Sequence, residues 1–218
     1  MGCKSCKPLN PTEIPDNLPL LESLVSDYLN RKFEWPEYPD KGAVTAQEWH
    51  DIYLSSLEDV TDFICGKINP TKAPGGMPYV FNIHQWNLRF PSRQNVVDKM
   101  AEKLGNIDDN DFGDFEELID YVEKRKVPYF GETAVYDFAL RYGWNHRPAI
   151  KPSKYVYIHS KPRKAAQHLA DHGYLKNITK LERKMELEKY QELLLPGMEA
   201  SDVEHFLCCY HDEILKLK

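Results

Sequence analysis

The sequence predicts an all-α protein: a multi-helix globular chain with a helix-hairpin-helix element and at most a token strand. Three observations lead to this prediction. Apolar residues recur at three- and four-residue spacing along most of the chain. Helix N-cap patterns precede several of these segments, and glycine follows several of them. Apolar residues make up 42% of the 218 residues, which is enough for a buried core.

The N-terminal part is predicted to begin with an unstructured segment and one helix. Residues 1–16 are polar and contain prolines, so we expect a flexible lead there. The helix that follows has an apolar stripe with helical spacing. The stripe consists of Leu18, Leu21, Leu24, Val25 and Tyr28.

Further helices are predicted up to Leu104. Thr45 and Glu48 form a capping box that opens a helix to about Ile64. Residues 69–78 are rich in proline and glycine and predict a loop, and the aromatic segment 79–90 is a short strand or a buried loop. A helix capped by Ser92 then runs to Leu104 and stops at Gly105.

The centre of the chain is predicted to be a helix, a tight turn over 127–134 and a second helix. Asp114 and Glu117 are placed as a capping box for the first helix, and Gly143 is a predicted stop for the second. Both helices have inward-facing apolar residues. They are Phe115, Leu118, Ile119 and Val122 in the first, and Val135, Phe138, Ala139 and Tyr142 in the second.

The C-terminal part is predicted to add three more helices. Residues 154–159 lead into a helix that contains Pro162 in its first turn and ends at Gly173. Residues 180–195 predict a strongly charged helix, and residues 201–204 form a third capping box before the last helix. The last helix is predicted to bury Val203, Phe206, Leu207, Tyr210 and Ile214.

Two helical parts are expected, 17–104 and 105–218, sharing a packed interface because the apolar stripes are wide. The sequence has no apolar run long enough to span a membrane and no signal-peptide pattern, which predicts a cytoplasmic protein. Five cysteines, two of them adjacent, do not form a disulfide framework. No complete cofactor or metal motif occurs, so we predict neither.

Charge is segregated along a chain whose net charge is −6. No acidic residue lies between Asp137 and Asp171, whereas residues 108–123 are acidic without a lysine or arginine. Such segregation favours a local face that binds an anion, although the basic segment can equally be a solvated surface that offsets the acidic helix. The basic residues are Arg141, Arg147, Lys151, Lys154, Lys161, Arg163 and Lys164.

This arrangement resembles the helix-hairpin-helix region of DNA glycosylases over roughly residues 114–172. The turn ends in Gly-x-Thr-Ala at residues 131–134, and Val156 and His159 match the family's Val-Asp-x-His motif. The resemblance implies a fold in which backbone amides of the hairpin bind a DNA phosphate. The same region, with residues 204–211, is also similar to a group of uncharacterised bacterial proteins, which implies no function.

The sequence departs from the glycosylase pattern in its chemistry. Tyr157 occupies the position of the aspartate, and Tyr129 stands where a first glycine is expected in a hairpin that is one residue shorter. The hairpin lysine of some members is absent, with Glu132 nearby. We therefore predict a nucleic-acid-binding protein, with DNA favoured over RNA, that lacks the family's glycosylase activity.

The predicted contacts combine the hairpin with the basic segment. The start of a helix carries about half a unit of positive charge and unsatisfied N–H donors, which favour a phosphate. Lysine and arginine add contacts that weaken with salt. The predicted nucleic-acid-binding residues are Phe130, Gly131, Thr133, Lys151, Lys154, Lys161, Arg163 and Lys164.

Two other functions fit the sequence. The first is a base-excision enzyme with a non-standard carboxylate, for which Asp137, Tyr157 and His159 are the candidate catalytic residues. The second is a protein-interaction module whose acidic 108–123 and basic 151–164 segments face protein partners. The sequence does not decide whether the chain is an enzyme.

Overall fold

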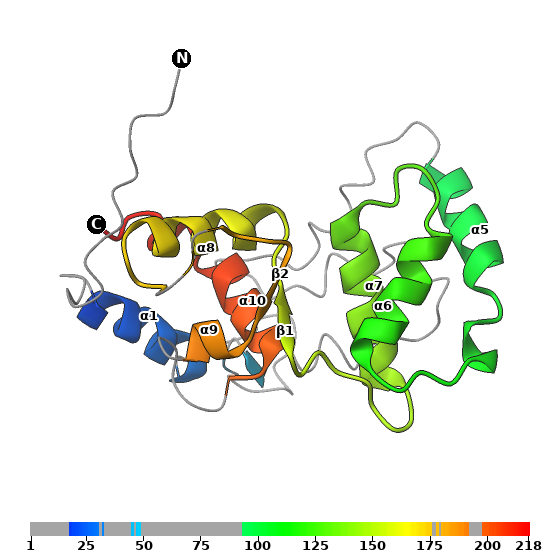
Figure 1. The fold of residues 1–218 in the computed structure, drawn as a ribbon, viewed down its shortest axis with the longest axis horizontal. Coiled ribbons are helices and arrows are strands. Elements are labelled where there is room, and N and C mark those ends of the chain that lie inside the picture. The colour runs from blue at the N-terminus through cyan, green and yellow to red at the C-terminus, as the bar shows by residue number, and fades with distance from the viewer. Residues whose placement is uncertain are drawn as a thin grey trace, which may run out of the picture. The chain divides into compact units, whose positions relative to one another are not determined.

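The protein is mainly helical (Figure 1). The computed structural model describes residues 18–30, 32, 45, 47–48, 93–175, 178, 180–191 and 198–218. Of these residues 62% are helical, and the one sheet among them has two short strands, which confirms the predicted fold class. The helices are α1 (Leu18–Asn30), α5 (Arg93–Leu104), α6 (Phe115–Arg125), α7 (Glu132–Asn145), α8 (Ser160–Asp171), α9 (Glu188–Gln191), α10 (Ala200–Cys209) and α11 (His211–Ile214).

These elements belong to two compact units. The first unit contains α1 and everything described from Lys154 to Lys218, and the second contains α5, the short 3₁₀ turn η3 (Ile107–Asp109), α6 and α7. The chain therefore leaves the first unit after α1 and returns to it at Lys154. This division differs from the expected boundary near Leu104, because α1 packs with helices that follow it by more than 170 residues.

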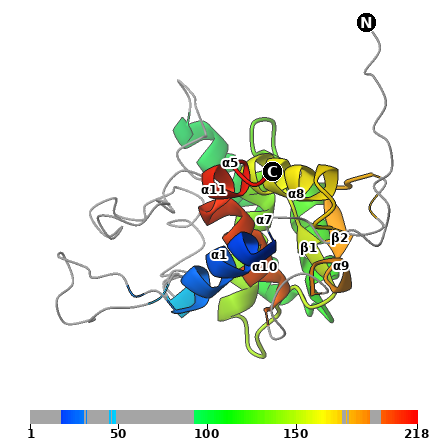
Figure 2. The same ribbon diagram turned by 90° about the vertical axis from the view of Figure 1, so that its left-hand side faces the viewer.

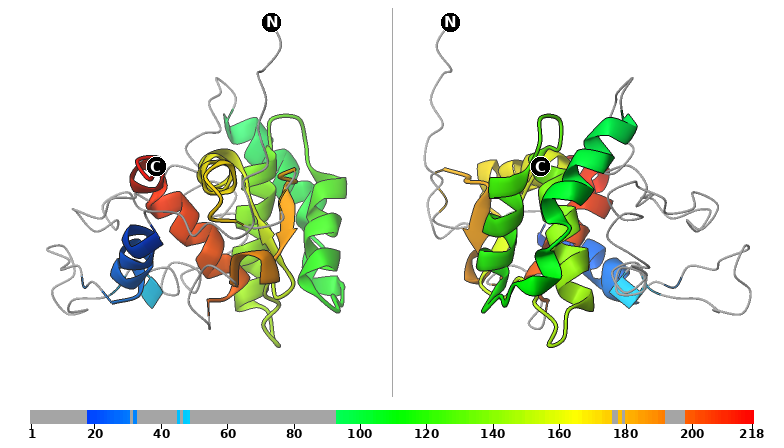
Figure 3. Two further views of the ribbon diagram at one scale, coloured as in Figure 1. Left: turned by 60° about the vertical axis from the view of Figure 1, so that its left-hand side comes forward. Right: turned by 90° about the vertical axis from the view of Figure 1, so that its right-hand side faces the viewer.

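Helices α6 and α7 pack against each other in the second unit, with α5 beside α6 (Figure 3, right). The ring of Phe115 meets that of Tyr136 edge-on, with centroids 6.1 Å apart. All eight predicted inward-facing residues of the two helices are buried, so the 3.6-residue periodicity identified both faces correctly.

The N-terminus of α6 is capped by the predicted aspartate. The Asp114 carboxylate accepts a hydrogen bond from the amide of Glu117 at 2.9 Å. The Glu117 carboxylate accepts one at 2.8 Å from the amide of Gly113, one residue earlier than in a capping box. The predicted cap at Asp114 is therefore confirmed. The Glu117 side chain, however, bonds to Gly113 and not to the backbone of Asp114 itself.

We expect Asp114→Ala to lower the free energy of unfolding by about 1 kcal/mol, because the first turn of α6 loses its acceptor. Asp120→Ala removes the same charge from an exposed position inside α6 and serves as the matched control. Urea denaturation of both variants measures the difference. Equal losses in the two variants would show that charge, and not capping, is responsible.

Gly143 is not the helix stop that the sequence predicted, since α7 continues to Asn145. The structure gives another reason for this glycine. A Cβ atom on Gly143 would lie 2.2 Å from the carbonyl oxygen of Ile150 and 3.1 Å from a methyl carbon of Leu118. The Ile150 amide also donates a hydrogen bond to the Gly143 carbonyl at 2.8 Å. The absence of a side chain thus lets the returning chain touch α7.

The prediction of one continuous helix over 180–195 is wrong, since among the described residues of that range only Glu188–Gln191 is helical. Lys184–Glu186 forms strand β2, which pairs antiparallel with β1 (Tyr155–Tyr157), and a short helix, α9, follows. The pairing is continued by a hydrogen bond at 2.8 Å from the Ile158 amide to the Arg183 carbonyl. Lysine, methionine and glutamate favour helices, and the sheet partner overrides that preference here.

Helix α8 begins and ends as predicted. Pro162 lies in its first turn, where a missing N–H costs little. Gly173 follows the helix with φ of 77°, and the Tyr174 amide donates to the Leu169 carbonyl at 2.8 Å. These contacts form the left-handed C-terminal cap that favours glycine.

The last helix is capped two residues earlier than predicted and is divided in two. Glu199 and Asp202 form the capping box of α10, whereas Ser201 is a buried residue of its first turn. The helix ends at Cys209, and α11 begins at His211. The apolar residues predicted for this region are nonetheless all buried.

Helices α1 and α10 lie side by side in the first unit (Figure 2), and Tyr28 joins them. Its side chain is fully buried and meets the ring of Phe206 edge-on. The Tyr28 hydroxyl lies 3.0 Å from Nδ1 of His205, and the Tyr210 hydroxyl donates to the Asp27 carboxylate at 2.8 Å. Leu21 and Val25 complete the buried stripe of α1, while Leu18 and Leu24 are half-buried.

Much of the predicted N-terminal part lies outside the described residues. The capping box at Thr45 is confirmed, since Thr45 and Glu48 exchange both hydrogen bonds, at 2.7 and 3.1 Å. The lead over 1–16, the body of the helix after Glu48, the loop over 69–78, the segment 79–90 and the Ser92 cap are outside the description.

Candidate nucleic-acid interface

The connection between α6 and α7 is the tight turn that the sequence predicted. The Phe130 amide donates to the Val127 carbonyl at 3.0 Å, which closes a four-residue turn. Pro128 is the second residue of the turn, and Tyr129 is the third, with φ of 79°. Proline followed by a residue with positive φ is the pattern of a type II turn.

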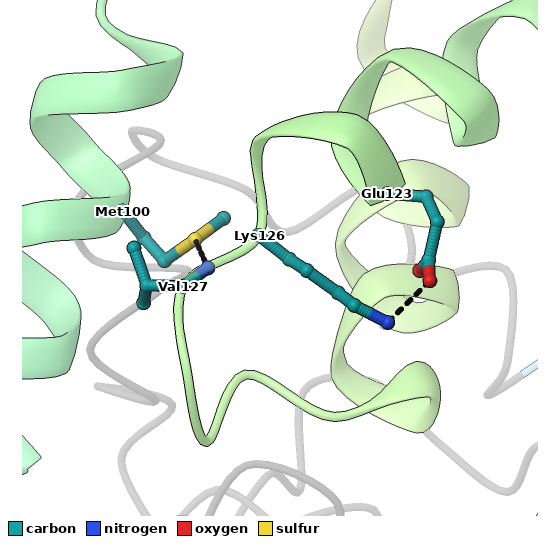
Figure 4. Close-up of polar contacts among 4 residues, drawn as sticks. All are labelled: Met100, Glu123, Lys126 and Val127. Atoms are coloured by element: carbon teal, nitrogen blue, oxygen red, sulfur yellow. Dashed lines mark hydrogen bonds and ion pairs between the residues drawn. The ribbon is translucent and has the colours of Figure 1, made fainter.

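The two ends of the turn are buried, and its middle faces solvent. Val127 and Phe130 are 5% and 3% exposed, whereas Tyr129 is 66% exposed. The Val127 amide also donates to the sulfur of Met100 on α5 at 3.4 Å (Figure 4). Because both ends are anchored, the turn presents Pro128 and Tyr129 outward.

Phe130 does not fit the predicted role of a ligand contact. Its ring is in the core, and its amide is already bonded within the turn. Gly131 and Thr133 are better placed, at the N-cap and in the first turn of α7. Gly131 has no side chain that could accept hydrogen bonds from the amides of that turn. The amides of Thr133 and Ala134 therefore retain the capacity to bind an anion.

Neither the backbone conformation nor the packing at position 131 requires a glycine. The φ of Gly131 is −72°, which any residue can adopt. No atom lies within 4 Å of the position that a Cβ atom would occupy. The space that a side chain at this position would occupy is therefore open. Glu132, the next residue, places a negative charge in the first turn of α7 and opposes an anion there.

Three consecutive basic residues precede the turn, and the sequence analysis did not recognise the run as a unit. Lys124 is exposed in the last turn of α6. The Arg125 guanidinium lies 3.4 Å above the ring of Tyr121. Lys126 is paired with Glu123 (Figure 4). The signal was visible in the sequence as a cationic run directly before the turn.

The basic residues predicted as contacts are divided between the two units. Lys151 belongs to the second unit, where its amine lies 3.7 Å from the centre of the Trp144 ring. Lys154, Lys161, Arg163 and Lys164 belong to the first unit, whereas the hairpin belongs to the second.

Within the first unit, Lys154 directly precedes β1, and Lys161, Arg163 and Lys164 lie in the first half of α8. The Lys154 amine lies 5.0 Å from the centre of the Tyr155 ring, and Arg163 donates to the Leu181 carbonyl at 3.2 Å. Lys164 is exposed and Lys161 half-buried. Lys164 is therefore an accessible cation of this group for testing.

The three candidate catalytic residues are divided between the two units. Asp137 is half-buried on α7 in the second unit. Tyr157 is buried in β1 and His159 is the N-cap residue of α8, both in the first unit. Tyr157 occupies the position where the glycosylase pattern has aspartate, and it supplies no carboxylate.

His205 and Cys209 form a buried polar contact in the first unit that the sequence analysis did not pair. Cys209 Sγ lies 3.0 Å from His205 Nε2, and Nδ1 of the same ring faces Tyr28. Burial raises the pKa of the Cys209 thiol, which disfavours the nucleophilic thiolate. Within the described part of the chain, no three His, Cys, Asp or Glu side chains are grouped to hold a metal ion.

Comparison of the chain with protein-family models, curated proteins and solved structures gave no significant match in any of the three. Among the described helices, none combines the length and apolar character needed to cross a bilayer.

Proposed function

We propose that the protein binds nucleic acid, preferentially DNA, through the hairpin between α6 and α7 and the basic surface of α8. The observation that carries the proposal is the solvent-facing turn at 127–131, which lies between a cationic run and an uncapped helix N-terminus. Phosphate is an anion that both features favour.

The supporting electrostatics are local. Lys124 to Lys126 supply positive charge directly before the turn, and the amides of the first turn of α7 supply donors directly after it. The chain as a whole carries a charge of −6, so its affinity for DNA is expected to be modest and strongly dependent on salt. Lys161 and Lys164 on α8 are proposed as a separate set of contacts in the first unit.

The proposal does not include glycosylase chemistry. That reaction needs a carboxylate near the sugar of a flipped nucleotide, and the matching position holds a buried tyrosine. Incubation with a panel of damaged oligonucleotides is expected to give no abasic product. Base release from any of them would overturn this part of the proposal.

The binding test uses two surface lysines in equivalent positions. Lys124 lies in the last turn of α6 beside the hairpin, and Lys103 lies in the last turn of α5; both are exposed. We expect Lys124→Glu to weaken binding of a labelled oligonucleotide about tenfold at ~50 mM salt, because a phosphate contact becomes a repulsion. Lys103→Glu should change the affinity by less than about threefold.

The contribution of α8 is measured with Lys161→Glu combined with Lys164→Glu. An unchanged affinity in this double variant would remove α8 from the interface. If Lys103→Glu and Lys124→Glu weakened binding to the same extent, the binding would depend on net charge alone and not on the hairpin. Absence of binding in the unmodified protein, together with co-purification of a stoichiometric protein, would favour the protein-interaction function.

A further inference from the structure

Tyr129 is an unusual residue for the place it occupies. The third position of a type II turn requires positive φ, which glycine and asparagine adopt readily and residues with larger side chains disfavour. Tyr129 nonetheless holds φ of 79° there, with 66% of its surface exposed. Most of the Tyr129 surface is therefore accessible to a ligand.

The surroundings of Tyr129 combine an aromatic surface with positive charge. Lys124 is exposed a few residues before the turn, whereas the charge of the half-buried Lys126 is offset by its ion pair with Glu123. Gly131, with open space beside it, is two residues further on, so its Cα atom lies within about 7 Å of that of Tyr129. This separation suits a single nucleotide, with its base at the ring and its phosphate at the helix N-terminus.

An aromatic surface flanked by cations distinguishes unpaired from paired bases. In an intact duplex each internal base is stacked on both faces, and its ring is inaccessible to a protein side chain. In a single strand the face of each base can stack on tyrosine, while the backbone phosphates meet the cations. The exposed ring therefore adds binding for an unpaired nucleotide that it cannot add for an intact duplex.

We propose that Tyr129 stacks on an unpaired base, so that the hairpin binds single-stranded nucleic acid in preference to duplex. This inference rests on the proposed function, because it assigns the class of nucleic acid that the same hairpin binds. Stacking distinguishes a single-stranded ligand from a double-stranded one. It does not identify a sequence, since every base has an aromatic face.

The test compares the full-length protein with three Tyr129 variants. Tyr129→Gly and Tyr129→Asn remove the ring and suit positive φ, whereas Tyr129→Phe retains the ring. Each protein is titrated against a labelled oligothymidylate of about 12 nucleotides and against a duplex of the same length at ~50 mM salt, with fluorescence anisotropy as the readout.

We expect the unmodified protein to bind the single strand more tightly. Tyr129→Gly and Tyr129→Asn should weaken that binding about 5-fold to 150-fold and change duplex binding by less than about threefold. Tyr129→Phe should bind both probes as the unmodified protein does. The melting temperature of Tyr129→Gly should equal or exceed that of the unmodified protein, which separates the loss of binding from unfolding.

Two results would overturn the inference while leaving the proposed function intact. They are tighter binding of the duplex by the unmodified protein, and single-strand affinity unchanged in Tyr129→Gly. Failure of the unmodified protein to bind either probe would remove the proposed function as well. A strand carrying photoreactive 5-iodouracil gives an independent measurement, since the inference requires the crosslink to map to Tyr129.

Discussion

Tyr28→Ala is expected to lower the free energy of unfolding of the first unit by about 3–5 kcal/mol, the usual cost of truncating a buried aromatic side chain. The ring is fully buried and meets Phe206 and Tyr210 edge-on. Its loss leaves a cavity between α1 and α10. Chemical denaturation measures the loss, and hydrogen exchange should show the amides of α1 exchanging much faster than those of α10.

Two further substitutions in α1 make this test specific. Leu20 is 49% exposed in the same helix, so Leu20→Ala should change the stability by less than about 0.5 kcal/mol. Tyr28→Phe retains the ring and removes only the hydroxyl that faces His205, which should cost about 1 kcal/mol. If the α1 amides of the Tyr28→Ala variant exchanged no faster than those of the Leu20→Ala variant, the docking of α1 through the Tyr28 ring would be contradicted.

Gly143→Ala is expected to destabilise the second unit by about 2 kcal/mol despite the better helix propensity of alanine. Overpacking here is expected to cost about 3 kcal/mol, and the higher helix propensity of alanine returns about 1 kcal/mol. The new methyl group would lie 2.2 Å from the Ile150 carbonyl oxygen. The neighbouring atom is backbone and cannot rotate away, so the segment carrying Ile150 must move.

Gly131→Ala is the matched control for this substitution, since open space surrounds that position. Alanine is a somewhat poorer N-cap than glycine, so we expect a loss of at most about 1 kcal/mol. Urea denaturation of the two variants gives the comparison. A Gly143→Ala protein as stable as the unmodified one would mean that Ile150 does not approach α7 this closely.

Local sequence patterns predicted the hairpin because its determinants are local. The Asp114 cap and the apolar spacing of α6 and α7 depend on residues within a few positions of each other. By contrast, Lys184–Glu186 has helix-forming residues and becomes a strand because Tyr155–Tyr157 pairs with it. That partner lies about 30 residues away, and residue propensity carries no information about it.

The candidate site was predicted in part. The turn and the start of α7 followed from the glycine and the helical periodicity. The exposure of Tyr129 depends on Val127 and Phe130 being anchored in the core, and Val127 reaches Met100, which is 27 residues away. The grouping of the hairpin with residues 154–164 stays a prediction, because the chain passes from the second unit into the first at Lys154. Adjacency in sequence across Lys154 does not place two segments in one unit.

The separation of 177 residues between Tyr28 and His205 also has a consequence for biosynthesis. At about 5–20 residues per second, a ribosome needs roughly 9–35 s to add the chain between them. During this interval Leu21, Val25 and Tyr28 have no completed partner surface. The second unit is continuous in sequence and can be finished earlier. The nascent N-terminal helix is therefore the segment for which early chaperone protection would matter most.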